Sequence, residues 1–598
     1  MTQPIMSRLA RLIQSAVPWR EREDRFAALP LTGRRQTDDD HDDDDAEDED
    51  LKDVEHFGHT ANSKKRRLGC GSPSLRKYLS ILLPFYLAAP LGLTDRKLPA
   101  THATTYLNGI RGLACWAVLN HHLVMGPYAP WIFRPYGSHE PDLASNQHFW
   151  QLPWFRSVHT GKGMVCIFFA LSGYVLAYSP ARKMNAKGPR SASYGDEMLT
   201  SLASSTLRRA IRLFGPMLVV VFLMALQTYY CWWAHNYKPL ADSVFGQVYA
   251  VWLNIVPILN PYRWDYVMPV PVGQTWTLGF EYRLSLLLFL VTLSVSRVSA
   301  VPRKLIILSV MVWGFYCDRR WDVFAFLGGS LVAECRFAPI ADDVASVLRT
   351  DRLRPHRHLV TFFAVLAVAV GLLFCSVPEE YPDQGWPYNM FWSWTLPKSW
   401  VGHHAEPSAA WIWWYGGIGS VILLWGVEQL PLLQRALAIA PFSYLGEISY
   451  AFYLLQNAAA QAIGWPFWTY AEKSLGWSSG WAFALYYVVT QIACLTMADY
   501  FWRSVDLNFV VLARLVVVDW LGVGRKDKAA GGGGTTTGAG LASAAMVAPV
   551  LAVPAAAEMT PYSPVPEAFA LQGESDDDDT LPVSERESIE NKPARLID

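Results

Sequence analysis

Charged residues are scarce in this chain. Only 17% of its 598 residues are Asp, Glu, Lys or Arg, whereas 52% are hydrophobic. A soluble globular protein has roughly 25% charged residues. Many of the acids gather near the two ends, in DDDHDDDDAEDED and GESDDDD, and the middle of the chain is poor in charge. This profile argues against an ordinary soluble protein and is typical of a membrane domain with two polar tails.

Cysteines with metal-binding spacing are also missing. The eight cysteines are scattered, mostly in apolar runs, without a CxxC or Cys/His ligand pattern. We therefore expect neither a disulfide framework nor a structural zinc site, and no metal in the active site. The N-terminal stretch lacks a clean apolar core followed by small residues, so no signal peptide is expected and the first membrane span would act as the targeting signal.

About ten apolar segments approach the roughly 20 residues needed to cross about 30 Å of hydrocarbon. We predict an all-α polytopic membrane protein, a bundle of about ten transmembrane helices with disordered N- and C-terminal tails. The predicted spans are residues 106–126, 162–180, 207–234, 274–296, 303–317, 322–338, 359–377, 409–427, 441–464 and 481–502.

The chain divides into four predicted parts by composition. Acidic and low-complexity tails cannot bury a core, and the short apolar run near the first span is broken by prolines. The parts are a disordered acidic cytoplasmic tail (1–72), an interfacial or re-entrant segment (73–100), the transmembrane domain (101–523) and a disordered C-terminal tail (524–598).

Lysine and arginine indicate the orientation of the predicted bundle. They are frequent in the connections after the second and sixth spans, whereas loops 378–408 and 465–480 hold one lysine each. Cytoplasmic loops carry the excess of positive charge. Both termini are therefore expected in the cytoplasm, with the plasma membrane and a secretory-pathway membrane both left open.

The first predicted span contains an arginine and two histidines, which are costly in hydrocarbon. Arg111 and His122 are 11 residues apart, so on a helix they share one stripe about 16 Å apart along the axis, whereas His121 points about 100° away. Arg111 alone could extend to lipid headgroups, and His122 could bond to another helix. Together they suit a polar path, since histidine exchanges protons near neutral pH and arginine binds phosphate.

Six motifs in order resemble the membrane acyltransferase-3 family, over roughly residues 100–505. The first holds an arginine, ten residues and a histidine, which correspond to Arg111 and His122. The long polar tails and tryptophan-rich loops resemble fungal members. The motifs are LNGIRGLACWAVLNHH, IFFALSGYVLAY, LRRAIRLFGP, QTWTLGFEYRLSLLLF, FLGGSLVAE and LGEISYAFYLL.

The resemblance implies an O-acyltransferase that moves an acyl group, acetyl or longer, from acyl-CoA to a hydroxyl of a carbohydrate, lipid or secondary metabolite. His122 is then the candidate general base, and Glu281 the carboxylate that orients it. Arg111 and three arginines of the third span are candidates for the CoA phosphates. Those three are Arg208, Arg209 and Arg212.

Each assignment has a structural alternative. The arginine cluster also fits ordinary positive-inside topology, and Glu281 could instead pair with Arg283. The candidates for substrate contacts also fit two structural roles, packing between helices and anchoring at the membrane interface. They are Ser172, Trp276, Tyr282, Ser449 and Tyr450.

Two positions depart from the family pattern. Gln456 stands where the family often has a second histidine, and Gly215 leaves open which arginine contacts the donor. No tightly bound cofactor is expected, and acyl-CoA is the expected co-substrate. The expected partners are membrane lipids, the acyl donor and the hydroxyl acceptor, with no nucleic acid and no preferred oligomeric state. The alternative function is a transporter or flippase in which Arg111, His122 and Glu281 relay protons.

Overall fold

The computed structural model describes residues 83–94, 98, 102–138, 147–186, 192–230, 239–340, 357–391 and 410–524. Across these ranges the regular structure is helical and no strand occurs, which confirms the all-α prediction. The predicted N-terminal tail lies outside the described residues, as does the C-terminal tail beyond Gly524.

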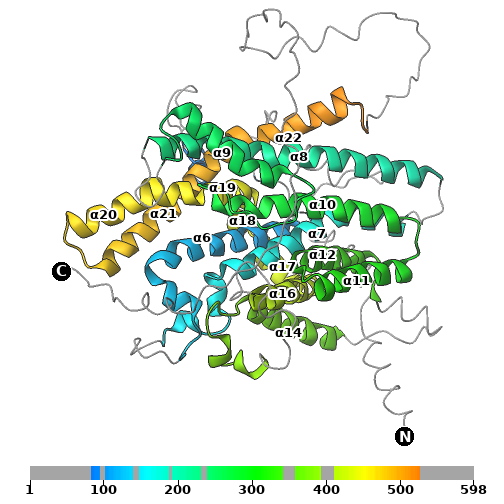
Figure 1. The fold of residues 1–598 in the computed structure, drawn as a ribbon. Helices are drawn as coiled ribbons and strands as arrows, with labels where there is room; N and C mark the ends of the chain where they lie inside the picture. Colours follow the sequence, from blue (N-terminus) through cyan, green and yellow to red (C-terminus); the bar gives the residue numbers. More distant parts are fainter. Residues whose placement is uncertain are drawn as a thin grey trace, which may run out of the picture. The chain divides into compact units, whose positions relative to one another are not determined.

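Long and short helices make up one bundle (Figure 1). In the first half of the chain they are α5 (Phe85–Ala88), α6 (Thr105–Phe133), α7 (Gly161–Ala186), α8 (Ala192–Tyr229), α9 (Val244–Leu259), α10 (Trp276–Val295), α11 (Ala300–Cys317) and α12 (Trp321–Phe337). In the second half they are α14 (Arg357–Cys375), α16 (Ala410–Glu428), α17 (Pro431–Leu437), α18 (Ala440–Glu447), α19 (Ser449–Ala459), α20 (Trp465–Lys473), α21 (Ser479–Phe501) and α22 (Leu507–Arg514). Short 3₁₀ helices are η1 (Phe149–Gln151), η2 (Phe155–Val158), η3 (Gly273–Thr275) and η4 (Pro382–Gln384). The π-helical turns are η7 (Ala460–Gly464), η8 (Trp502–Asp506) and η9 (Leu515–Trp520).

Within the described residues, six helices have the length and apolar composition to cross a membrane. A seventh is obtained if α16 and α17, which meet at a bend of 102°, form one broken span. The predicted count of about ten is therefore not confirmed. The six are Gly161–Ala186, Tyr194–Tyr229, Gly273–Val295, Ala300–Cys317, His358–Cys375 and Ser479–Trp520.

Two of the predicted spans outside this set are short or interrupted. The span 322–338 corresponds to α12, which has only 17 residues. The span 441–464 is divided among α18, α19 and the π-helical turn η7. The first span, 106–126, lies within α6, whose helical geometry breaks only beyond the span, at Tyr128 (φ −128°, ψ 27°). An apolar run in a sequence does not reveal such breaks, because they depend on tertiary packing.

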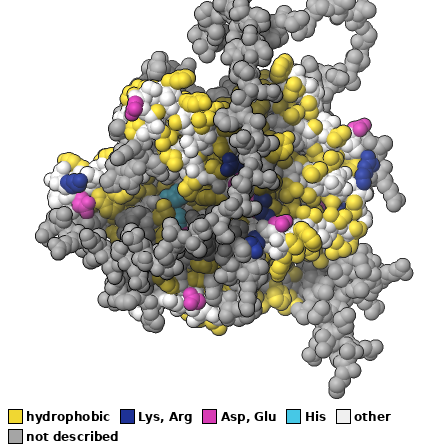
Figure 2. All heavy atoms as spheres, viewed as in Figure 1, with side chains coloured by type: hydrophobic (Ala, Val, Ile, Leu, Met, Phe, Trp, Pro, Cys, Tyr) yellow, Lys and Arg dark blue, Asp and Glu magenta, His cyan; other side chains and the backbone are white. Residues whose placement is uncertain are grey.

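The outward faces of the long helices are apolar. Leu290 of α10, Trp313 of α11 and Phe362 of α14 are 61%, 68% and 62% exposed. Figure 2 shows hydrophobic side chains over much of the described surface in one view, with few charged side chains between them. Extended apolar surface of this kind indicates contact with a membrane or a partner. With the spanning helices, it supports a multi-pass membrane protein.

Helix α6 contributes to the two larger apolar cores of the bundle. One core packs it against α7, α12 and α16, with Ala114, Phe169 and Phe326 among its buried side chains. The other packs it against α8, α19 and α21, where Leu119 and Phe452 are buried. The helix that carries Arg111 and the histidine pair is thus enclosed by other helices (Figure 1).

Glycines allow α7 and α12 to approach closely. A Cβ atom at Gly173 would lie 1.8 Å from the carbonyl oxygen of Phe326, and one at Gly329 would lie 1.9 Å from that of Ala170. Small residues at such crossings allow helix backbones to pack in membranes. The LSGY and FLGG motifs therefore have a packing role at this crossing.

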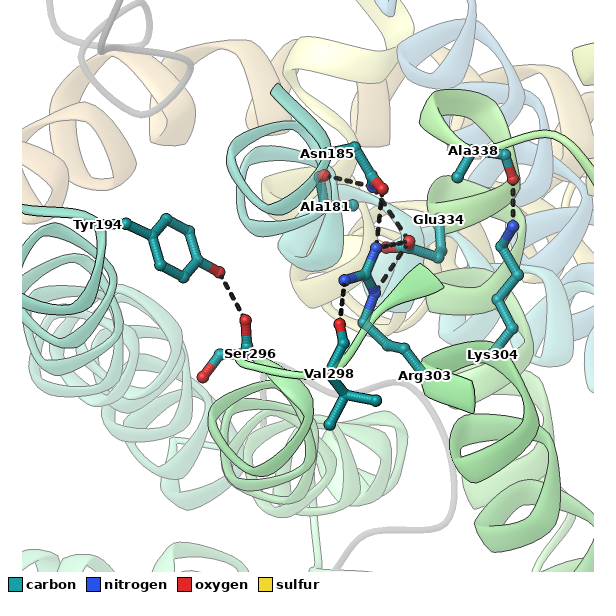
Figure 3. A network of polar contacts seen from close by, with 9 residues as sticks. All are labelled: Ala181, Asn185, Tyr194, Ser296, Val298, Arg303, Lys304, Glu334 and Ala338. Atoms are coloured by element: carbon teal, nitrogen blue, oxygen red, sulfur yellow. Dashed lines mark hydrogen bonds and ion pairs between the residues drawn. The ribbon is translucent and has the colours of Figure 1, made fainter. Parts of the chain in front are cut away.

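A buried polar network ties the ends of α7, α11 and α12 (Figure 3). Arg303 and Glu334 have side chains only 1% and 2% exposed, and Arg303 Nε donates to Glu334 Oε1 at 3.0 Å. Asn185 accepts from Arg303 at 2.8 Å and donates to Glu334 at 3.0 Å. Both charges are paired, as burial of charged groups requires.

Candidate active site

Arg111 joins α6 to the junction between α18 and α19. Its guanidinium donates to Asn108 Oδ1 at 3.1 Å and to the Gly446 carbonyl at 3.0 Å. Ser449 Oγ donates to the same carbonyl at 2.7 Å. Arg111 Nε is buried and has no hydrogen-bond partner within the described part of the chain. Arg111 is therefore held in place and retains a donor group for a ligand.

His122 and Gln456 are two polar residues on helices α6 and α19, which contact each other. The contact is Cys115 Sγ of α6 donating to the Ser449 carbonyl of α19 at 3.2 Å. His122 and Gln456 each follow these residues by seven positions, close to two helical turns or about 10.5 Å. Among the described residues, His122 Nδ1 and both amide atoms of Gln456 are buried without a hydrogen-bond partner. Buried polar atoms of this kind are costly unless a ligand or water satisfies them.

His121 belongs to a second polar group at the end of the bundle opposite Arg111. Its Nδ1 lies 3.1 Å from the His159 carbonyl, and its Nε2 lies 3.9 Å from Glu379 Oε1. Lys162, in the first turn of α7, forms an ion pair with Glu379 at 3.0 Å. The rings of His121 and His122 are 5.7 Å apart. Lys162 and Glu379 were absent from the sequence predictions.

Arg156 holds in place the segment after α14 that carries Glu379. It is 1% exposed and donates to the carbonyls of Ser376 at 3.1 Å, Arg134 at 2.7 Å and Ile132 at 2.7 Å. Three charge-assisted hydrogen bonds, two of them buried, hold the end of α6 and the segment after α14 against η2. Glu379 follows Ser376 by three residues, so its position near the histidines is determined by this clamp.

Glu281 forms a polar cluster between α7, α8 and α10. Arg209 donates to Glu281 Oε1 at 2.7 Å, and Ser172 Oγ donates to the same oxygen at 2.9 Å. Arg209 also donates to Ser285 Oγ at 3.1 Å. The structure thus brings together three predicted site residues, with Arg209 as the ion-pair partner of Glu281. The predicted role of Glu281 beside His122 stays a prediction.

Arg283, the alternative partner of Glu281, donates instead to the Asn260 carbonyl at 3.2 Å. Its side chain also lies over the ring of Trp264, 5.9 Å from the centroid. It therefore packs at the start of α10, away from the Arg209 cluster.

Arg208 and Arg212 belong to α8, and Tyr450 of α19 contacts that helix. Arg208 Nε donates to the Ser204 carbonyl of its own helix at 3.4 Å, and Arg212 follows one turn later. Tyr450 of α19 donates to the Leu213 carbonyl. These contacts place α8 and α19 together, and binding of a donor by the arginines stays a prediction.

The two predicted pocket aromatics lie in ring clusters. Tyr282 contacts Phe214 edge to face, with centroids 5.0 Å apart, and Trp276 contacts Trp413 at 6.0 Å. Such pairs contribute to packing. Contact of either ring with a substrate stays a prediction.

Among the described residues, no group of three or more His, Cys, Asp and Glu side chains is arranged to hold a metal ion. The arrangement instead offers cations, imidazoles and hydroxyls, which suit acid–base chemistry on an organic substrate.

Comparison with known proteins identifies the chemistry. The family model described as "Acyltransferase domain" matches residues 104–499. Similar curated proteins include O-acetyltransferase PaAT-1 of Phomopsis amygdali, 26% identical over 73% of this chain and 88% of that protein. Acyltransferase R4 of Phoma sp. (strain ATCC 20986 / MF5453) is 23% identical over 68% of this chain and 93% of its own length.

A third relative, acyltransferase clz18 of Cochliobolus lunatus, is 24% identical over 67% of this chain and 93% of its own. No solved structure matches the chain. The matched domain covers more than half of the chain and contains the six motifs that resembled this family. The chain therefore belongs to the acyltransferase-3 family and is an acyltransferase.

Proposed function

We propose that this protein transfers an acyl group, acetyl or longer, from acyl-CoA to a hydroxyl of a carbohydrate, lipid or secondary-metabolite acceptor. The observation that carries the proposal is a pair of buried polar groups without a hydrogen-bond partner among the described residues, Nδ1 of His122 and the amide of Gln456. Each follows the contact between α6 and α19 by seven residues. The printed name of one relative, an O-acetyltransferase, supports acetyl transfer to oxygen.

His122 acts as the general base in this scheme. It takes the proton of the acceptor hydroxyl as the oxygen attacks the thioester carbonyl. The carbon–sulfur bond then breaks, and the proton passes to the CoA thiolate, which leaves as the thiol. The Gln456 amide provides a hydrogen-bond donor and an acceptor beside the reacting groups.

Arg111 and the arginines of α8 hold the phosphates of CoA. Arg111 lies about 16 Å from His122 along the helix axis, a length that the pantetheine arm can bridge between phosphates and thioester. The end of α6 that carries Arg111 is then the cytoplasmic one. The transport alternative is disfavoured because the chain belongs to a family of acyltransferases.

The proposal predicts acceptor-dependent release of CoA. Purified full-length protein in lipid nanodiscs, given acetyl-CoA and an extract of deletion-strain glycans, lipids and metabolites, should release CoA thiol as one component gains an acetyl mass. Wild-type cells should contain the acylated component, and deletion cells and His122→Ala cells should lack it. Transport of a solute without consumption of any acyl-CoA would refute the proposal.

A second prediction concerns Arg209 as a phosphate ligand. Arg209→Ala should raise the KM for acetyl-CoA about tenfold or more, since a hydrogen bond to a charged group contributes about 1.5–3 kcal/mol. With acetyl-pantetheine, which lacks the nucleotide phosphates, the variant and wild type should have the same KM. An equal loss with both donors would show that Arg209 acts only through its ion pair with Glu281.

A further inference from the structure

Lys162, Glu379 and His121 form a compact polar group beside His122. They come from α7, from the segment after α14 and from α6, and their side chains are 23%, 15% and 9% exposed. Nothing in the proposed acyl transfer uses them. A lysine, a glutamate and a histidine gathered near the end of a membrane bundle need an explanation, since ionised groups there are costly.

The orientation of His121 is determined by its surroundings. A carbonyl oxygen only accepts hydrogen bonds, so the 3.1 Å contact between His121 Nδ1 and the His159 carbonyl places the proton on Nδ1. Gly161 gives the ring its room, because a Cβ there would lie 2.6 Å from His121 Cδ2. The His159 side chain is itself held by the Trp150 carbonyl at 2.9 Å, and burial, reinforced by Arg156, lowers the pKa of His159 to about 4.

This orientation leaves an unfavourable contact unless a donor lies between the groups. With the proton on Nδ1, a neutral His121 presents a lone pair at Nε2, which faces the Glu379 carboxylate at 3.9 Å. That distance exceeds a hydrogen bond, and two acceptors that face each other repel. The ammonium of Lys162, 3.0 Å from the other carboxylate oxygen, is the nearby donor and balances the charge of Glu379.

A hydroxyl group satisfies this arrangement. It donates one proton, to His121 Nε2 or to Glu379, and its oxygen accepts from Lys162. We propose that Lys162, Glu379 and His121 form a subsite that binds a second hydroxyl of the acceptor, next to the one that is acylated at His122. This inference rests on the proposed function and makes the preferred acceptor a diol or polyol rather than an isolated alcohol.

The subsite can be tested with two small alcohols that differ by one hydroxyl, 1,2-propanediol and 1-propanol. Full-length protein in nanodiscs is given acetyl-CoA with either alcohol, and CoA release and acetyl ester are measured. Wild type should use the diol with a kcat/KM at least tenfold higher than the alcohol, since a site built to bond a hydroxyl rejects the analogue without it. Lys162→Met and Glu379→Gln should each abolish this preference.

The next residue provides the matched control. Glu380 pairs with Arg134 at 2.9 Å and its side chain is 42% exposed, so Glu380→Gln should keep the diol preference. Wild type without a preference, or Lys162→Met and Glu379→Gln that retain it, would overturn the subsite and leave acyl transfer standing. Wild type that acetylates neither alcohol nor any component of the deletion-strain extract would overturn the proposed function, and the subsite with it.

Discussion

His122→Ala should lower the rate of acyl transfer by about 10²–10⁴-fold, the usual contribution of a general base. The acceptor hydroxyl is a poor nucleophile until its proton is removed, whereas the thioester carbonyl is already electrophilic. The variant should still bind acyl-CoA, because the arginines assigned to the phosphates lie elsewhere. The measurements are kcat for CoA release with a saturating acceptor and the dissociation constant of the donor.

Folding should be retained in this variant, which makes the result interpretable. His122 Nδ1 has no hydrogen-bond partner among the described residues, so truncation breaks no bond at that atom. Added imidazole should restore part of the rate in His122→Ala and none in Arg111→Ala. A variant that keeps more than half of the wild-type kcat would exclude His122 as the base.

The stripe of Arg111 and His122 was predictable because it depends on helical periodicity within one element. The structure adds that Arg111 is held by the Gly446 carbonyl and that Cys115, between Arg111 and His122 on α6, contacts Ser449 of α19. The family motifs selected the candidate residues. Their contacts depend on how α6 packs against α18 and α19.

The contact between Arg209 and Glu281 was only half predictable. Both residues were chosen from motifs, for separate roles, and their ion pair at 2.7 Å depends on the packing of α8 against α10. Lys162 and Glu379 were missed altogether. A lysine in the first turn of a span and a glutamate in a loop resemble ordinary interface residues. Tertiary contacts such as the Arg156 clamp bring that glutamate to His121.

The all-α fold followed directly from long apolar runs, whereas the number of spans did not. Residues 441–464 read as one span in the sequence, but the helix is interrupted at Ile448, between α18 and α19. That break presents the Gly446 carbonyl to Arg111. The break at Ile448 therefore makes the number of spans hard to predict from the sequence, and it also positions the Gly446 carbonyl in the candidate site.

Glu334→Ala should destabilise the fold by about 3–5 kcal/mol, the cost of leaving one member of a buried ion pair alone. Arg303 would remain 1% exposed with its charge uncompensated, and Lys304 lies beside it in the same network (Figure 3). The Asn185 amide would lose one of its two acceptors and keep the Ala181 carbonyl. The free energy of unfolding can be measured by SDS titration in mixed micelles, with far-UV circular dichroism as the readout.

Two further variants test whether the loss of stability comes from the broken ion pair or from mutation of any charged residue. Arg303→Met combined with Glu334→Leu removes both charges and should be less destabilising than Glu334→Ala, since a buried pair replaced by apolar side chains is often neutral. The pair Arg263–Asp265, 45% and 75% exposed, is the control, and Asp265→Ala should have at most a small effect. If Glu334→Ala matched Asp265→Ala, the network would not hold α7, α11 and α12 together. The close α7–α12 crossing at Gly173 and Gly329 would then have to maintain the position of Ser172 beside Glu281 by itself.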